Sequence, residues 1–206
     1  MKPIIIVCGV PHSFTSMISN FLIDNGAYAN PTWDDPKWNM NYSRFEDKEI
    51  QNYVNKKKDF KKYDLTKYFQ RFPKNSVCII KSPRAAFYLN EIKSFTDREL
   101  KVVYVLRNPE QIILSSMKKS PKSFIFYFER INWMYDFIVN TDLEVFQFVA
   151  ERIYKDGESL LKYCELPAEN INFNSIRGME YRRTSFIKYR FANLFWKMLS
   201  KLFRVL

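Results

Sequence analysis

Four short runs of apolar, mostly β-branched residues recur along the chain, and each gives way to a polar segment. They are residues 3–8, 77–80, 101–106 and 145–149. Continuous apolar runs of this length are typical of strands buried on both faces of a parallel sheet. Stretches with helical spacing follow them, one ending at Asn25-Gly26, one over 123–140 and one beginning at 158. Strands that alternate with helices predict an α/β fold with a mainly parallel central sheet.

Two segments stand apart from this alternation. Residues 28–75 contain prolines and a basic amphipathic stretch, and we expect them to leave the sheet as a lid or acceptor segment. We expect one domain over 1–180, followed by a basic amphipathic helix over 181–206. That helix either docks on its own core, lies on an anionic membrane surface through 186–206, or forms a dimer seam.

Charge is concentrated rather than spread over the 206 residues. The net charge is +11, and residues 181–206 contain seven basic residues and no acidic one, while residues 55–74 contain eight basic and two acidic ones. This clustering favours one polyanionic ligand and a basic tail, and no nucleic-acid partner is expected.

Cysteine and histidine usage excludes several other classes of protein. Three widely spaced cysteines and a single histidine indicate neither a disulfide framework nor a metal site. The first apolar run is too short for a signal peptide, and no run approaches a membrane span. We therefore expect a cytoplasmic protein.

The ends of three predicted strands carry polar groups suited to an anion. They are Gly9–Ser16 (GVPHSFTS), Lys81–Arg84 (KSPR) and the segment that starts at Arg107 (RNPE). In a parallel sheet these ends meet at one edge, and a loop before a helix N-terminus presents unpaired backbone N–H groups. Compared with the nucleotide P-loop GxxxxGK[ST], Phe14 replaces the second Gly and Thr15 replaces the Lys. This pattern favours binding of a phosphate-like group and disfavours ATP hydrolysis.

These residues resemble the sulfotransferases that use 3′-phosphoadenosine 5′-phosphosulfate (PAPS), particularly short bacterial or phage-type members. GVPHSFTSM is similar to the family's first loop, and RNPEQIILS places Arg107, Pro109 and Ser115 at the spacing of its 3′-phosphate motif. The turn KSPR, the Phe45-Glu46-Asp47 element and the stretch 148–167 are also similar to family elements. The resemblance covers roughly residues 3–167 in family order. It implies a P-loop-like three-layer α/β/α fold.

The resemblance also implies site residues. The first loop would hold the 5′-phosphosulfate, and Arg107 and Ser115 would hold the 3′-phosphate. Lys81 would stabilise the transferring sulfuryl group. Glu46 would be the general base, with Asp34 and Asp35 as alternatives. The loop residues are Pro11, His12, Ser13, Phe14, Thr15 and Ser16, and Arg84 would assist them. His12 and Phe14 depart from the family, which has Arg or Lys and Gly there; His12 either contacts the anion or is an exposed loop residue. Glu151 would be an ion-pair partner for a loop cation.

The implied reaction is sulfuryl transfer from PAPS to a hydroxyl or amine of a small molecule or glycan, which leaves 3′-phosphoadenosine 5′-phosphate (PAP). The aromatic residues of the 28–50 region either line an acceptor pocket or form a small satellite core. Two alternatives remain: a degenerate sulfotransferase-fold protein that binds nucleotide or membrane without turnover, and a P-loop-like kinase. The sequence indicates neither the acceptor nor the oligomeric state.

Overall fold

The computed structural model describes residues 1–29, 47–55, 64–109, 111–112, 115 and 124–177. The chain divides into two compact units, Met1–Ser175 and Ile176–Leu206. Nearly all of the second unit lies outside the described residues, and so do the predicted basic helix and about half of the predicted lid. The fold below is that of the first unit.

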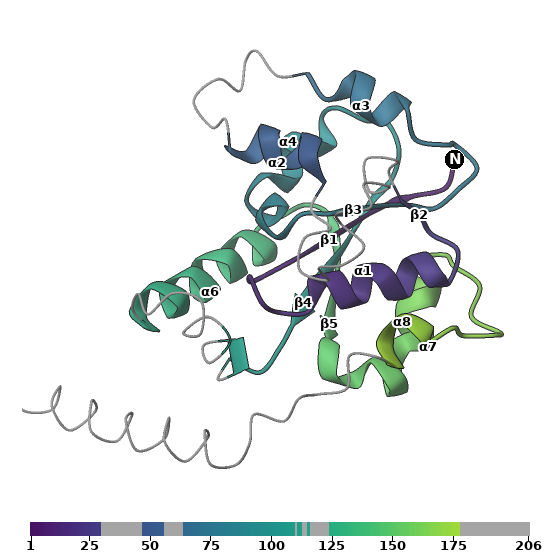
Figure 1. Ribbon diagram of the computed structural model, residues 1–206. Coiled ribbons are helices and arrows are strands. Elements are labelled where there is room, and N and C mark those ends of the chain that lie inside the picture. Colours follow the sequence, from purple (N-terminus) through teal and green to yellow (C-terminus); the bar gives the residue numbers. More distant parts are fainter. Residues whose placement is uncertain (30–46, 56–63, 110, 113–114, 116–123, 178–206) are drawn as a thin grey trace, which may run out of the picture. The chain divides into compact units, whose positions relative to one another are not determined.

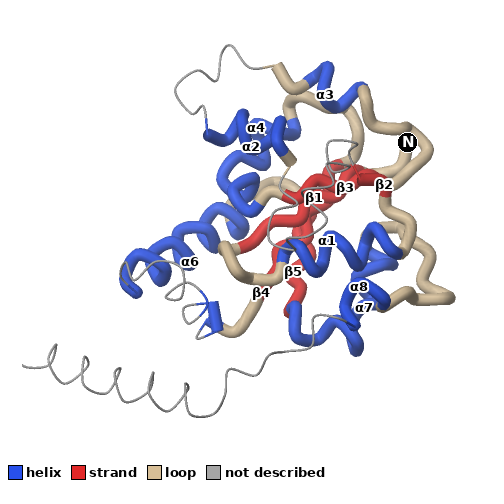
Figure 2. Tube along the Cα trace, in the orientation of Figure 1, coloured by secondary structure: helices blue, strands red, loops and turns tan. Residues whose placement is uncertain are grey.

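Five parallel strands form the sheet within the described residues (Figures 1 and 2). They are β1 (Ile4–Gly9), β2 (Tyr28–Ala29), β3 (Cys78–Lys81), β4 (Leu100–Leu106) and β5 (Glu144–Val149). Their order is β2-β3-β1-β4-β5, and all four pairings are parallel. The predicted α/β fold with a mainly parallel sheet is therefore confirmed. The predicted excursion is wrong at its start, because Tyr28 and Ala29 pair with β3 as an edge strand.

Helices flank the sheet on both faces, an arrangement consistent with three layers (Figure 1). Helix α1 (Thr15–Asp24) packs on β1 and β3, and α7 (Ile153–Tyr163) packs beside it, where a Cβ on Gly157 would lie 3.1 Å from Phe21. The opposite face is covered by α2 (Lys48–Asn55), α3 (Thr66–Gln70), the 3-10 helix η3 (Pro83–Tyr88), α4 (Leu89–Lys93) and α6 (Phe124–Val139). The short helices η4 (Ala150–Arg152) and α8 (Asn174–Arg177) complete the element order. The helix predicted to begin at 158 begins five residues earlier, at Ile153.

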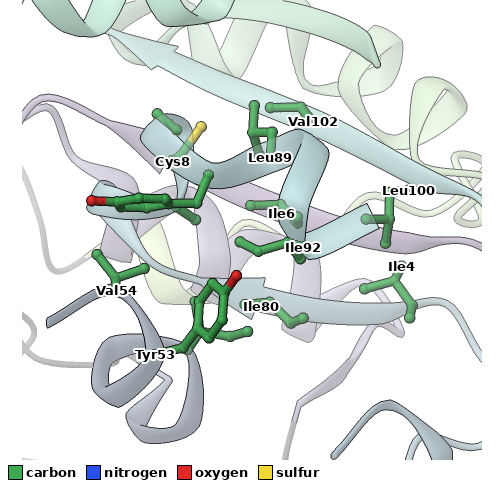
Figure 3. Packing of buried hydrophobic residues seen from close by; sticks show 14 of the residues in the cluster. Ile4, Ile6, Cys8, Tyr53, Val54, Ile80, Leu89, Ile92, Leu100 and Val102 are labelled. Carbon is green, nitrogen blue, oxygen red and sulfur yellow. The ribbon is translucent and has the colours of Figure 1, made fainter. Parts of the chain in front are cut away.

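The core on the α2–α4–α6 face is built from alternate residues of the central strands. Ile4 and Ile6 of β1 are fully buried beside Ile80 and Val102 of the neighbouring strands. Figure 3 shows their side chains meeting Leu89 and Ile92 of α4, with Tyr53 and Val54 of α2 nearby. Full burial of one such aliphatic side chain contributes roughly 1.5–3 kcal/mol. The next residue along each strand points to the α1 face, which explains why the strands read as uninterrupted apolar runs.

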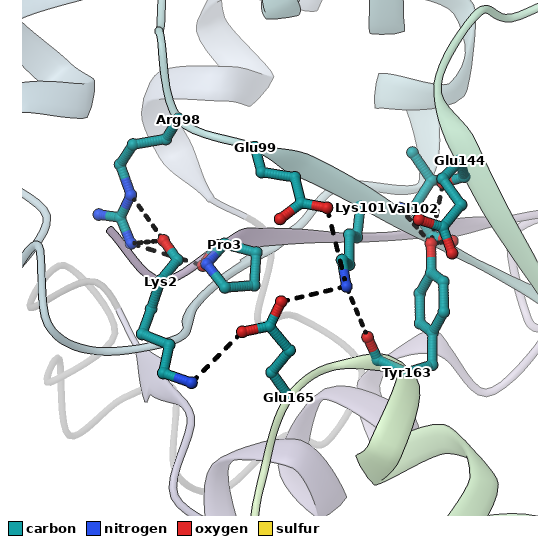
Figure 4. Close-up of polar contacts among 9 residues, drawn as sticks. All are labelled: Lys2, Pro3, Arg98, Glu99, Lys101, Val102, Glu144, Tyr163 and Glu165. Atoms are coloured by element: carbon teal, nitrogen blue, oxygen red, sulfur yellow. Dashed lines mark hydrogen bonds and ion pairs between the residues drawn. The ribbon is translucent and has the colours of Figure 1, made fainter.

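Polar side chains connect several segments at the end of the sheet where the strands begin (Figure 4). Arg98 is buried, and its Nη2 donates hydrogen bonds to the carbonyls of Lys2 at 2.6 Å, Ser76 at 2.9 Å and Pro3 at 3.4 Å. Lys101 contacts Glu165 at 3.2 Å. These contacts join the N-terminal residues, the turn before β3 and the start of β4, so this edge is structural.

Candidate anion-binding site

The carboxyl ends of β3, β1 and β4 lie side by side, because these strands are neighbours in the sheet. From β1 the chain passes through α1 toward β2, whereas from β4 it continues to β5 on the other side. Connections that diverge from two adjacent strands leave a crevice, and this is where open α/β sheets bind ligands. The three polar segments predicted from the sequence therefore surround the switch point between β1 and β4.

Gly9 allows the first loop to pass close to β4. A Cβ at this position would lie 2.7 Å from Ser13 Oγ and 2.7 Å from the carbonyl oxygen of Val105. Contacts this short require the backbone to shift, so the position accepts only glycine without rearrangement. Gly9 thereby fixes how the loop turns from β1 toward α1.

The N-terminus of α1 presents unpaired donors to this edge. The first hydrogen bond of the helix runs from the Ile18 N–H to the carbonyl of Phe14, the N-cap residue. The three N–H groups before it, those of Thr15, Ser16 and Met17, have no acceptor within the described part of the chain. Phe14 adopts a left-handed conformation with φ 68°, and His12 has φ 73°. Phe14 thus takes the type of backbone conformation that favours glycine, the residue the resemblance leads one to expect there.

Two buried hydroxyl groups and one buried lysine accompany these donors. Ser13 and Ser82 are fully buried, and neither Oγ has a hydrogen-bond partner among the described residues. Lys81, the last residue of β3, is 1% exposed. The Ser82 N–H donates to the carbonyl of Val7 at 3.1 Å, which holds the KSPR turn against β1. Buried polar groups are normally paired, so the orphaned Ser13 hydroxyl, which directly precedes the N-cap of α1, is a donor expected of an anion site, and Ser82 adds a second orphaned hydroxyl after β3.

Arg107 connects the segment after β4 to the first loop. Its Nη1 donates to the carbonyl of His12 at 2.7 Å, and its guanidinium carbon lies 3.8 Å from the centre of the Phe14 ring. Nε and Nη2 both donate to Gln111 Oε1, at 3.2 and 3.0 Å. Glu151 Oε1 lies 4.0 Å from Nε, which agrees with the predicted role of Glu151 as an ion-pair partner.

The remaining predicted site residues are placed as follows. Pro11 and Ser16 are half-buried in the first loop and first helical turn, and Thr15 is buried. Arg84 is exposed on η3, and Ser115 is a half-buried helical residue. The candidate bases Glu46, Asp34 and Asp35 lie outside the described residues. The structure therefore brings the first loop, the end of β3 and Arg107 to one edge.

Two further residues organise this edge: Asp47, which the sequence indicated only as part of the Phe45-Glu46-Asp47 element, and Gln111. Asp47 is fully buried: its N–H donates to the carbonyl of Lys81, its Oδ1 accepts from the Ile50 N–H, and its Oδ2 accepts from the Tyr68 hydroxyl at 2.6 Å. It therefore caps α2 and attaches it to the end of β3. Gln111 was missed as a partner of Arg107, because Arg107 lies just before the helix that holds Gln111 and the spacing rule for helical neighbours does not apply.

The cysteine nearest the loop is not a nucleophile. Cys8 is fully buried, and burial raises the pKa of its thiol far above its ordinary value. A thiol in that environment stays protonated at neutral pH, and the protonated thiol is not the reactive species. With Cys8 excluded, the candidate groups of this edge are backbone donors, hydroxyls, the half-buried His12, Lys81 and Arg107.

No protein-family model matches the chain, and no curated protein is similar enough in sequence to count as a match. Among the helices that the structure describes, none is long and apolar enough to cross a bilayer.

Proposed function

We propose that the protein is a PAPS-dependent sulfotransferase with a P-loop-like fold, which transfers a sulfuryl group to a hydroxyl or amine acceptor. One observation carries this proposal. The first loop and Arg107, which are 95 residues apart, are joined by the hydrogen bond from Arg107 to the His12 carbonyl and by the Phe14 contact, on either side of the switch point between β1 and β4. The sequence resemblance assigns these two segments to the two phosphate groups of one nucleotide.

The donors at this edge fit the anionic end of such a nucleotide. The N–H groups of Thr15, Ser16 and Met17 and the hydroxyls of Ser13 and Ser82 would hold the 5′-phosphosulfate. Arg107, oriented by Gln111 and Glu151, would provide the positive charge for the 3′-phosphate. PAPS, when bound, supplies the activated sulfuryl group.

Among the described residues, Lys81 is best placed to stabilise charge during transfer. It ends β3 beside the first loop, and its burial strengthens any electrostatic interaction with an anion. Its backbone is fixed from two sides, by pairing with β1 and by the Asp47 N–H. The proton of the acceptor would pass to a carboxylate, and Glu46 is the proposed base because it directly precedes Asp47 in the sequence.

A second function is favoured by one specific observation. The first loop has His12 and Phe14 where the resemblance leads one to expect an arginine or lysine and a glycine, and such departures are expected of a fold that has lost turnover. A degenerate sulfotransferase fold that binds nucleotide without turnover would have the same geometry, and it differs from the first proposal only in the absence of sulfuryl transfer.

Calorimetric titration with PAP and with ATP–Mg²⁺ tests the cofactor site. We expect micromolar binding of PAP that is much tighter than binding of ATP, and at least a tenfold loss of PAP affinity in Arg107→Ala, since a bond to a charged group contributes roughly 1.5–3 kcal/mol. Arg71→Ala is the matched control, because Arg71 is an exposed arginine that lies over the Tyr68 ring, at the end of α3. Equal affinity of the wild type for PAP and ATP, or equal losses in both variants, would refute the proposal.

A further inference from the structure

We infer that Phe14 is a positioning residue, which holds the Arg107 guanidinium, and through it the first loop, in the shape that receives the anion. The inference rests on the proposed function for the identity of the anion. The contact itself is independent of it: the guanidinium carbon lies 3.8 Å from the centre of the Phe14 ring. A phenylalanine at this place in the loop is a departure from the resemblance, so its role cannot be taken from that resemblance.

The contact lies within a set of restraints that converge on one guanidinium. The His12 carbonyl accepts from Nη1, Gln111 Oε1 accepts from Nε and Nη2, and Phe14 covers a face of the group. Arg107 is consequently only 13% exposed. Because the guanidinium is planar and rigid, fixing one face and three of its nitrogens fixes its orientation completely.

The same restraints fix the backbone of the loop. His12 and Phe14 both have positive φ, on either side of the buried Ser13, and such conformations persist in residues other than glycine only when surrounding contacts enforce them. Arg107 contacts both residues, His12 through its carbonyl and Phe14 through its ring. The contact between the Phe14 ring and Arg107 therefore offsets the conformational cost of a positive φ at Phe14, a cost that glycine would not have.

This arrangement is a brace rather than part of the apolar core. Phe14 is half-buried and lies outside the cluster of apolar residues that α2, α4 and α6 form with the sheet. Its ring connects the loop after β1 to Arg107, which follows β4, so the position of the guanidinium and the shape of the loop depend on each other. A substitution at Phe14 should act on anion affinity through Arg107.

A double-mutant cycle tests the brace without any ligand. Urea unfolding is measured for the full-length wild type, Phe14→Leu, Arg107→Lys and the double variant, with Phe14→Tyr as the conservative replacement. We expect a coupling of roughly three- to tenfold in the unfolding equilibrium constant between positions 14 and 107, and near-wild-type behaviour of Phe14→Tyr. Arg71→Lys, a change of the same kind at another arginine–aromatic contact, should show no coupling with Phe14→Leu.

PAP titration of the folded variants tests the positioning role. We expect Phe14→Leu to bind PAP roughly three- to tenfold more weakly and Phe14→Tyr to bind it like the wild type. Absence of coupling, or coupling with unchanged PAP affinity in Phe14→Leu, would overturn the inference. If the wild type itself did not bind PAP, the proposed function would fail, and the unfolding cycle alone would decide whether the brace exists.

Discussion

The replacement of Gly9 by alanine tests how the first loop is positioned. The new Cβ would lie 2.7 Å from both Ser13 Oγ and the Val105 carbonyl oxygen, whereas ordinary contact begins at 3.4 Å. Val105 belongs to a central strand, so the loop rather than the sheet must move. Overpacking costs about 1–3 kcal/mol, and the φ of 154° adds a conformational cost of similar size for a residue with a Cβ. We expect a loss of about 2–5 kcal/mol of unfolding free energy.

Urea unfolding followed by circular dichroism measures this loss. With an m-value of about 2 kcal/mol per molar urea, the midpoint should fall by roughly 1–2.5 M. Gly26→Ala is the control for conformational cost alone, because Gly26 has φ 101° but a Cβ added there would meet nothing within 4 Å. Gly157→Ala is the control for a contact that a side chain can relieve, because the nearest atom is the end of the Phe21 ring. A Gly9→Ala loss no larger than that of Gly26→Ala would refute the steric reasoning.

Three further predictions concern stability. Arg98→Lys should lose about 2–4 kcal/mol, measured by thermal unfolding, because one ammonium cannot replace the bonds to several buried carbonyls. Burial alone would raise the pKa of Glu165, but hydrogen bonds from Lys101 and Lys2 lower it in the folded protein. The contribution of Glu165 to the free energy of unfolding is therefore present above the unfolded pKa of about 4.3 and is lost on acidification. It stays below about 1 kcal/mol, since the side chain is a third exposed. Glu165→Gln should remove this contribution from a profile of stability against pH. Asp47→Ala should cost about 2–4 kcal/mol in urea unfolding, and Tyr68→Phe should cost less in that background than in the wild type.

Each of these predictions can be contradicted by a specific result, and Arg98→Lys also has a control. The control for Arg98→Lys is Arg152→Lys, which changes an exposed arginine paired with Asp156 and should leave the melting temperature nearly unchanged. If Arg98→Lys also left the melting temperature nearly unchanged, the structural role of Arg98 would be contradicted. An unchanged acid limb in Glu165→Gln would contradict the assigned pKa direction. Additive losses in the Asp47 and Tyr68 variants would contradict their hydrogen bond.

The sequence predicts most of the sheet because its central strands are buried on both faces. The runs at 3–8, 77–80 and 101–106 correspond to the buried central strands β1, β3 and β4. The run at 145–149 corresponds to β5, an edge strand with several exposed residues, which its apolar residues still indicate. The edge strand β2 has two half-buried residues, which is too short for any periodic pattern. The early start of α7 was missed because Gly157 interrupts its pattern, although the glycine leaves room for the Phe21 ring, which would lie 3.1 Å from a Cβ there.

The site was predictable where local rules apply and not where distant segments meet. A strand end followed by a helix marks Gly9–Ser16, and sheet geometry alone brings it to the same edge as Lys81 and Arg107. No local rule indicates that Phe14 takes a left-handed conformation and lies on Arg107, 93 residues away. The burial of Asp47 under α3 likewise depends on tertiary packing, because its partner Tyr68 comes from another element.

Sulfuryl transfer itself is the most direct test of the proposed function. The full-length protein would be incubated with sulfur-radiolabelled PAPS and a pool of hydroxyl and amine acceptors, and labelled products would be separated and counted. The account predicts transfer to at least one acceptor, lost in Lys81→Ala and retained in the control Lys74→Ala, an exposed lysine in the turn before β3. Tight PAP binding without transfer to any acceptor, or transfer that is unaffected by Lys81→Ala, would contradict it.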